Sequence, residues 1–317
     1  MPQKTILILI LYLFLEKVPL AADTLHAIIV ADTANWNGSA SFKTDLKKMK
    51  ILTNEIAQHT KLMLNFQAVS DKTLTYNQVK LVVEELSVKA KHDAVIFFYA
   101  GHGGRTSGKW SFWPLLDIKG EVLDMDWVKT TLERKNPRFL IILTDTCNHV
   151  NDALSPVWAR SAPDNAQSSA EGYRQLFLNY QGYVFASAAS PGEKAWGNAQ
   201  YGGFFRDAFE RSLRKASTLS NPSWNTIMKQ VEAPIEIEGN KQHPKSIVKI
   251  EAVHAGIATP TEDDCSYFYK PNGVLCCRKP NEVTTCDDTT EEEACPHYFY
   301  KPGGVLCCRR SSGDMCQ

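Results

Sequence analysis

The sequence of 317 residues predicts a three-layer α/β fold with a mostly parallel central sheet, followed by a small disulfide-rich tandem repeat. Two observations lead to this prediction. In residues 23–258, short runs that are apolar throughout alternate with longer segments of helical periodicity, which is typical of a parallel sheet covered by helices on both faces. Beyond residue 258 the composition changes, and eight of the nine cysteines are found there.

The first 22 residues have the pattern of a secretory signal peptide. Lys4 gives a basic start, residues 5–15 form an apolar core that is short for a bilayer span, and small residues precede a cleavage point expected after Ala22. An uncleaved membrane anchor and a buried strand are the alternatives. We expect the mature chain to begin near Asp23 and to be secreted, or to reside in another oxidising compartment outside the cytosol.

The region 23–258 is expected to fold as one domain, in which each element has its own pattern. Apolar residues recur on one helical face in the segment 75–91, and Asp126 and the pair Asn221-Pro222 are typical of helix N-termini. The expected strands are 26–31, 62–69, 94–100, 139–143, 182–188 and 246–253. The expected helices are 42–59, 75–91, 126–135 and 203–213.

The cysteine-rich region, residues 259–317, begins with a polar linker and contains an internal repeat. Residues 265–286 match residues 295–316, and both copies carry Tyr-Phe-Tyr-Lys-Pro and then Gly-Val-Leu-Cys-Cys-Arg. Modules this short cannot bury a real core, so we expect disulfides to hold them, two in each copy. Bonding the adjacent cysteines would strain the backbone, which leaves two connectivities, and a zinc site is the alternative. The cysteines concerned are Cys265, Cys276, Cys277, Cys286, Cys295, Cys307, Cys308 and Cys316.

Cys147 is the cysteine left over, and an odd cysteine in a secreted chain is either intermolecular or a reactive thiol. It follows the apolar run 139–143, as His102 follows the run 94–100. Sites in open parallel sheets form beyond the carboxyl ends of the strands, which lie ~4.8 Å apart when adjacent. Neighbouring strands would therefore bring a histidine base and acid to a thiolate nucleophile. The alternatives are a structural histidine and a cysteine that packs as a small hydrophobe.

The glycines around His102 allow the chain to turn sharply and bring an amide close to a substrate. The N–H groups of Gly103 and Cys147 are the natural donors for an oxyanion. His149 is the nearest competing base, but two positions after Cys147 it is expected to point away from the thiol.

The stretches "AVIFFYAGHGG" and "FLIILTDTC" resemble the caspase-like cysteine peptidases, especially metacaspases, paracaspases and bacterial caspase homologues, in the clan of caspases and legumains. "FWPLLD", "ASAASPGEKAW" and "GGFFRDAFERSL" extend the resemblance over most of residues 23–258. The resemblance implies a caspase-like fold and makes His102 and Cys147 the dyad of an endopeptidase. Metacaspases usually continue the cysteine with Ser-Gly, whereas Asn148 and His149 follow it here. Paracaspases also lack the Ser-Gly pair, so its absence does not by itself predict an inactive protein.

By the same resemblance, Asp145 faces the first substrate side chain, Asp45 matches a second acidic position, and Glu193 is a third candidate. A pocket with carboxylates would select arginine or lysine, and arginine can pair with them in a bidentate manner. The alternatives are that Asp145 caps the turn after its strand and that Asp45 is a solvated residue on a helix face.

The function expected from these observations is a secreted endopeptidase that cleaves peptide bonds after Arg or Lys. One alternative is a legumain-like asparaginyl endopeptidase or transpeptidase. Another is an inactive caspase-fold binding protein whose repeats use their Tyr-Phe-Tyr segments to bind a surface or a glycan.

The expected partners are protein or peptide substrates. The chain has 35 basic and 35 acidic residues, so its composition gives no reason to expect nucleic acid or an anionic membrane as a partner. No cofactor or metal site is expected. The sequence has no dedicated calcium-loop signature, and it leaves a calcium requirement open.

Overall fold

The computed structural model describes residues 23–34, 38–150, 168–237 and 240–253, and beyond them only the backbone of five short strands in the cysteine-rich region. The chain divides into two compact units, Met1–Val253 and His254–Gln317. The predicted signal peptide lies outside the described residues. Within the described ranges, no helix is long and apolar enough to cross a membrane.

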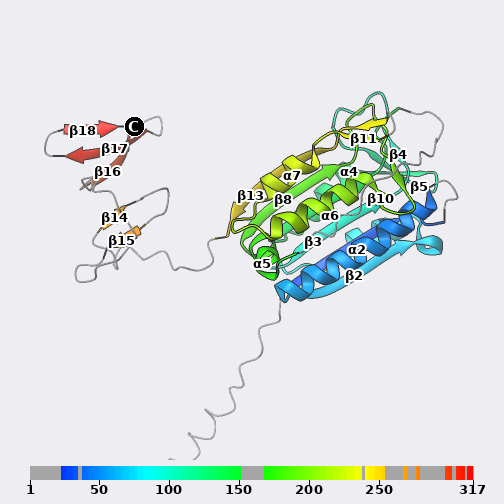
Figure 1. Ribbon diagram of the computed structural model, residues 1–317, viewed down its shortest axis with the longest axis horizontal. Helices are drawn as coiled ribbons and strands as arrows, with labels where there is room; N and C mark the ends of the chain where they lie inside the picture. Colours follow the sequence, from blue (N-terminus) through cyan, green and yellow to red (C-terminus); the bar gives the residue numbers. More distant parts are fainter. Residues whose placement is uncertain are drawn as a thin grey trace, which may run out of the picture. The chain divides into compact units, whose positions relative to one another are not determined.

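The first unit is built on a six-stranded sheet in the order β13-β8-β7-β3-β1-β2 (Figure 1). The strands β1, β2, β3, β7 and β8 run parallel to their neighbours, and the edge strand β13 runs antiparallel to β8. This arrangement confirms the predicted α/β fold with a mostly parallel sheet. The strands are β1 Thr24–Ala31, β2 Met63–Ser70, β3 Ala94–Ala100, β7 Phe139–Asp145, β8 Tyr180–Ser187 and β13 Lys245–Ala252.

One face of the sheet is covered by four helices, of which α2, α6 and α7 lie on the near side in Figure 1. Alternate strand residues such as Ile29, Ile96 and Ile141 point into this layer, where they meet the apolar faces of the helices. Its largest fully buried side chain is Trp224, which donates its indole N–H to Leu176 O at 2.8 Å. The helices are α2 Ser39–Thr60, α5 Ala170–Leu178, α6 Phe204–Ser217 and α7 Trp224–Val231.

The other face is covered by two helices and a small three-stranded antiparallel sheet. The intervening strand residues, such as Ile28, Phe97 and Ile142, pack there against Leu116 of the small sheet and Val128 of a helix. These elements are α3 Tyr76–Glu84, α4 Met125–Arg134, and the strands β4 Gly103–Gly104, β5 Leu115–Ile118 and β6 Glu121–Asp124. A short 3-10 turn, η1 Asp71–Thr73, precedes α3.

Three local predictions about helix ends were wrong. The helix expected over 75–91 ends at Glu84, because Asp93 accepts the Lys89 N–H at 2.7 Å and holds the following residues in a turn. The N-cap of α4 is Asp124 rather than Asp126, and its carboxylate accepts the Asp126 N–H at 2.9 Å. The helix expected to begin at Asn221-Pro222 begins at Trp224, two residues after the proline.

Several elements have no counterpart among the predicted ones. These are α5, the strands β4, β5 and β6, and two small hairpins, β9 Gly197–Asn198 with β10 Gly202–Gly203 and β11 Ile235–Ile237 with β12 Asn240–Gln242. Each strand in these pieces has only two to four residues, too few for a period-two pattern to be recognised.

In the second unit, each copy of the repeat pairs its Tyr-Phe-Tyr segment with its Cys-Cys-Arg segment in an antiparallel manner. The strands are β14 Tyr267–Tyr269 with β15 Cys276–Arg278, and β16 His297–Lys301 with β17 Val305–Arg310 and β18 Gly313–Cys316. The disulfides predicted for this unit depend on side chains outside the described residues, and they stay a prediction.

Candidate active site

His102 and Cys147 follow two neighbouring parallel strands at the same edge of the sheet. The strands β3 and β7 pair in register, and Ala100 lies opposite Asp145 at their carboxyl ends. Each of the two residues therefore comes two positions after the last paired residue of its strand. The predicted site required these two strands to be neighbours, which they are, and the register adds that both strands leave the sheet at the same level.

The loops that carry these two residues lie in contact. A Cβ atom on Gly103 would collide with the Thr146 hydroxyl, so only glycine fits at this point. Two positions further on, the Arg105 N–H donates to His149 O at 3.0 Å. The histidine loop and the cysteine loop thus run alongside each other from the end of the sheet.

The backbone carbonyl of His102 is held by a hydrogen bond from the buried Tyr99. The Tyr99 hydroxyl lies 2.6 Å from His102 O and 2.7 Å from Asp117 O, and the Asp117 N–H donates to His102 O at 3.0 Å. The Phe42 ring meets the imidazole edge-on with 5.6 Å between ring centroids. Burial raises the pKa of Tyr99 well above its usual value, so the phenol keeps its proton.

Cys147 is a free thiol that is partly buried beneath the segment 190–196. The Ala195 N–H donates to Cys147 Sγ at 3.4 Å, and Ala195 O lies 3.8 Å from the sulfur. Burial raises the pKa of the Cys147 thiol, and the Ala195 N–H opposes this shift by favouring the thiolate. The thiol therefore needs a base before it can act as a nucleophile.

Asp145 and Asp45 lie together on the side of the sheet that α2 and α6 cover, where both carboxyl groups meet the N-terminus of α6. Asp45 accepts the Gly203 N–H at 2.9 Å and the Arg206 Nε–H at 2.9 Å, and Asp145 accepts the Arg206 backbone N–H at 2.9 Å. Arg206 also donates to Glu210, which completes a buried cluster of charges.

The two aspartates of this cluster have raised pKa values. Burial raises the pKa of Asp45 to about 6, against the opposing effect of Arg206. Burial and the neighbouring Asp45 raise the pKa of Asp145 to about 8. Asp45 is fully buried, which excludes the alternative that it is a solvated residue on a helix face. The Asp145 carboxylate accepts a hydrogen bond from the start of α6, so it does not cap the turn after its own strand.

The glycine pair Gly202-Gly203 covers these carboxyl groups. A Cβ on Gly202 would overlap the carboxylate of Asp45, and one on Gly203 would overlap that of Asp145. Gly202 also has φ +81°, a backbone conformation that favours glycine. The backbone of Gly202 and Gly203 thus covers the carboxyl groups of Asp45 and Asp145. That these carboxyl groups contact a substrate side chain stays a prediction.

Glu193, the third acidic candidate, is joined to the loop of Cys147 through its backbone. The Asn148 N–H donates to Glu193 O at 2.9 Å, and the Gly192 N–H donates to Asn148 O at 2.8 Å. Its carboxylate accepts the His243 N–H at 2.9 Å, and the His243 ring Nδ1 lies 2.6 Å from the other oxygen. Glu193 therefore braces the segment over the thiol, at a place separate from the aspartate pair.

Arg206 and Tyr99 were missed by the sequence analysis. Of the two, only Arg206 has a signal in the sequence, and it is weak: a charged residue that directly follows Phe204 and Phe205 and lies four positions before Glu210. Tyr99 is indistinguishable from the other buried residues of its apolar run.

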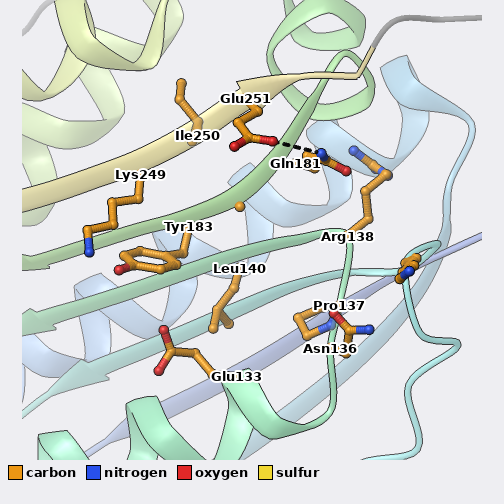
Figure 2. A pocket seen from close by; sticks show the side chains of 12 residues that line it. Glu133, Asn136, Pro137, Arg138, Leu140, Gln181, Tyr183, Lys249, Ile250 and Glu251 are labelled. Carbon is orange, nitrogen blue, oxygen red and sulfur yellow. Dashed lines mark hydrogen bonds between the residues drawn. The ribbon is translucent and has the colours of Figure 1, made fainter. Parts of the chain in front are cut away.

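A cavity of about 800 Å³ lies at the other end of β7 from Cys147 (Figure 2). It is lined by Leu140 and by residues of β8 and β13, and Gln181 donates to Glu251 across it at 3.1 Å. None of the predicted site residues lines it. In the described part of the chain, no group of three or more His, Cys, Asp or Glu side chains is arranged to hold a metal ion.

Comparison with known proteins gives one family match. The model of the caspase domain, the Peptidase_C14 family, matches residues 38–251. Among solved structures, protein GSU0716 from Geobacter sulfurreducens is similar with a TM-score of 0.47 and 14% sequence identity, over 71% of this chain and 92% of that chain. None of the curated proteins matches significantly.

Proposed function

Because the chain belongs to the caspase domain family of cysteine peptidases, we propose that it is an endopeptidase in which Cys147 is the nucleophile and His102 is the general base and acid. The observation that carries this proposal is the register of β3 and β7, which ends both strands at the same level two residues before His102 and Cys147. The contact of Gly103 with Thr146 supports it, because it holds the two loops together.

The proposed reaction is an acyl transfer to sulfur. His102 takes the thiol proton of Cys147, and the thiolate attacks the scissile carbonyl carbon to give a tetrahedral oxyanion. The N–H groups of Gly103 and Cys147 stabilise that oxyanion. His102 then protonates the leaving amine, and water hydrolyses the thioester with His102 again as the base.

We further propose that cleavage follows a basic residue. Asp145 supports this because it lies two residues before the nucleophile and because, among the described residues, its carboxylate accepts a hydrogen bond from a backbone N–H and from no side chain. The carboxylate of Asp45, in contrast, is already paired with Arg206. A basic side chain that reaches Asp145 would favour the ionised carboxylate over the protonated one. Secretion of the mature chain, from near Asp23, also remains part of this proposal.

The test is the turnover of fluorogenic peptides that end in Arg, Lys, Asn or Asp before the leaving group. We expect the Arg and Lys peptides to be cleaved, and we expect Cys147→Ala and His102→Ala each to lower kcat/KM by roughly a thousandfold or more. Preferential cleavage after Asn would favour a legumain-like activity. A Cys147→Ala variant as active as the wild type would contradict the proposal, and Cys147→Ser serves as the near-isosteric control.

A further inference from the structure

Two aromatic side chains beside the cysteine loop are strongly exposed. Trp110 is 99% exposed and Phe112 is 62% exposed, whereas the nearby Trp113 is only 5% exposed and packs against Phe185. Tryptophan is among the side chains that gain most from burial, and an exposed apolar cluster on a soluble domain marks a binding surface. Val150, three residues after Cys147, is also 55% exposed.

The loop between β4 and β5, residues 105–114, carries these rings and is called the aromatic loop; it is held by several hydrogen bonds and ion pairs. The Lys109 ammonium is 8% exposed and lies 2.7 Å from both the Asp124 and Asp126 carboxylates. The Ser111 hydroxyl donates to Asp126 at 2.5 Å, and Arg105 donates to Lys109 O and Ser111 O at 2.7 and 2.9 Å. Trp110 is therefore exposed on a loop that is held by many hydrogen bonds and in which both cations, Arg105 and Lys109, already have partners.

The same loop is tied directly to the residue after the nucleophile. The Asn148 side chain is fully buried and donates to Phe112 O at 2.8 Å. The oxygen of the same side-chain amide accepts a hydrogen bond from the Arg105 guanidinium at 3.2 Å. Asn148 thereby holds the aromatic loop at a fixed place next to Cys147, as a binding surface near the reacting bond requires.

The aromatic loop and the acidic pair lie on opposite sides of the sheet. Asp45 is on α2, which covers one face, whereas Trp113 and Leu116 anchor the aromatic loop to the core of the other face. Cys147 and His102 are at the sheet edge between them. If the basic side chain of a substrate points toward the acidic pair, the part of the substrate that follows the scissile bond would cross the sheet edge toward the aromatic loop. This loop directly follows His102, the proposed proton donor to the leaving amine.

We propose that Trp110 and Phe112 form an aromatic lip that binds an apolar side chain on the leaving-group side of the scissile bond, an inference that rests on the proposed peptidase function. The substrates are then polypeptides in which an apolar residue follows the cleaved bond within a few positions. Lys109 of the aromatic loop is paired with Asp124 and Asp126, and Arg105 donates to Lys109 O and Ser111 O, so both cations of the loop already have partners and a neutral side chain fits this surface better than a charged one.

Binding to the Cys147→Ala variant tests the lip without turnover. Two fluorescent peptides are compared by anisotropy, identical except that the residues after the cleavage position are Leu-Phe in one and Ser-Ser in the other. We expect the apolar peptide to bind about tenfold more tightly, and we expect Trp110→Ser or Phe112→Ser in the same background to remove most of this preference. Met63→Ser is the matched control, because Met63 is 57% exposed at the opposite end of the sheet.

Cleavage of the same two peptides by the chain with Cys147 intact separates the two proposals. If both peptides are cleaved without preference, and Trp110→Ser changes nothing, the lip is overturned and the peptidase stands. If neither peptide is cleaved but the binding preference persists and depends on Trp110, the peptidase proposal fails and the lip stands as a peptide-binding surface. Thermal unfolding of each variant checks the fold, which should be unaffected because both rings are exposed.

Discussion

At the scale of single residues, Asp145 holds its carboxyl group where ionisation is unfavourable. Its pKa is raised to about 8, from a model-peptide value near 4, by burial and by Asp45. Between these two pH values the folded chain binds more protons at this position than the unfolded chain. The contribution of Asp145 to stability is therefore fully present at acid pH and is lost as the pH rises through about 8.

We expect Asp145→Asn to remove this pH dependence while keeping the hydrogen bond from the Arg206 N–H, because an amide oxygen accepts it as well. The difference in Tm between the variant and the wild type should shift in favour of the variant from pH 5 to pH 9, as measured by thermal unfolding at several pH values. Parallel curves for the two proteins would contradict a raised pKa at Asp145. In the turnover assay, the same variant should lose its preference for basic peptides.

The candidate site shows how far sequence reasoning extends at this scale. His102 and Cys147 could be singled out because each follows an apolar run, and apolar runs are visible in a sequence. Arg206 could not be connected with Asp45, since 161 positions separate them and the ion pair forms only when α2 and α6 pack side by side. The resemblance to caspase-like peptidases placed two carboxylates near the nucleophile but could not reveal that the protein supplies its own guanidinium for one of them.

At the scale of secondary-structure elements, α2 and α6 are joined by the buried pair of Asp45 and Arg206. Both side chains are essentially inaccessible to solvent, and Arg206 also meets Glu210 one helical turn further on. Removing the cation would leave the buried Asp45 carboxyl group without its partner, whereas Glu210 would keep its pair with Arg214. The loss of a buried partner is far more costly than the loss of an exposed ion pair.

We therefore expect Arg206→Met to lower the free energy of unfolding by about 3–5 kcal/mol. The double variant Arg206→Met/Asp45→Asn should recover part of that loss, because one of the buried charges is then gone. Urea unfolding measures both. The control is Arg211→Met, whose side chain is 41% exposed and pairs with Asp207, and its effect should stay below about 1 kcal/mol. Equal losses for Arg206→Met and Arg211→Met would contradict the role given to the buried pair.

The elements themselves were predictable to different degrees. The strand β3 was predicted with its observed bounds, because every residue of it is apolar and buried. The end of β7 was not, since Thr144 and Asp145 are polar residues that are buried by contacts with Met125 and α6. The helix α5 was missed because it contains Gly172, where any Cβ would collide with the backbone of Ser217 on α6. Close helix packing requires that glycine, and the same glycine weakens the helical signal in the sequence.

At the scale of the whole molecule, the nine cysteines should fall into two chemical classes. Alkylation of the unfolded, unreduced protein should modify one thiol per chain, at Cys147, because we expect the other eight to be paired in the cysteine-rich region. Peptide mass spectrometry with and without reductant measures this. Modification of cysteines beyond residue 264 without reductant would contradict the predicted bridges and would favour a reduced or zinc-bound region.

The in-register pairing of β3 with β7 has a consequence for how such a chain can change over evolution. Exchanging one apolar residue for another in either strand does not change the number of residues between the end of the strand and His102 or Cys147. Inserting or deleting a single residue inside one strand would displace its terminal side chain by about 3.3 Å and turn it to the opposite face. We expect lineages of this protein to vary freely in the composition of both strands and to confine changes of length to the connecting segments.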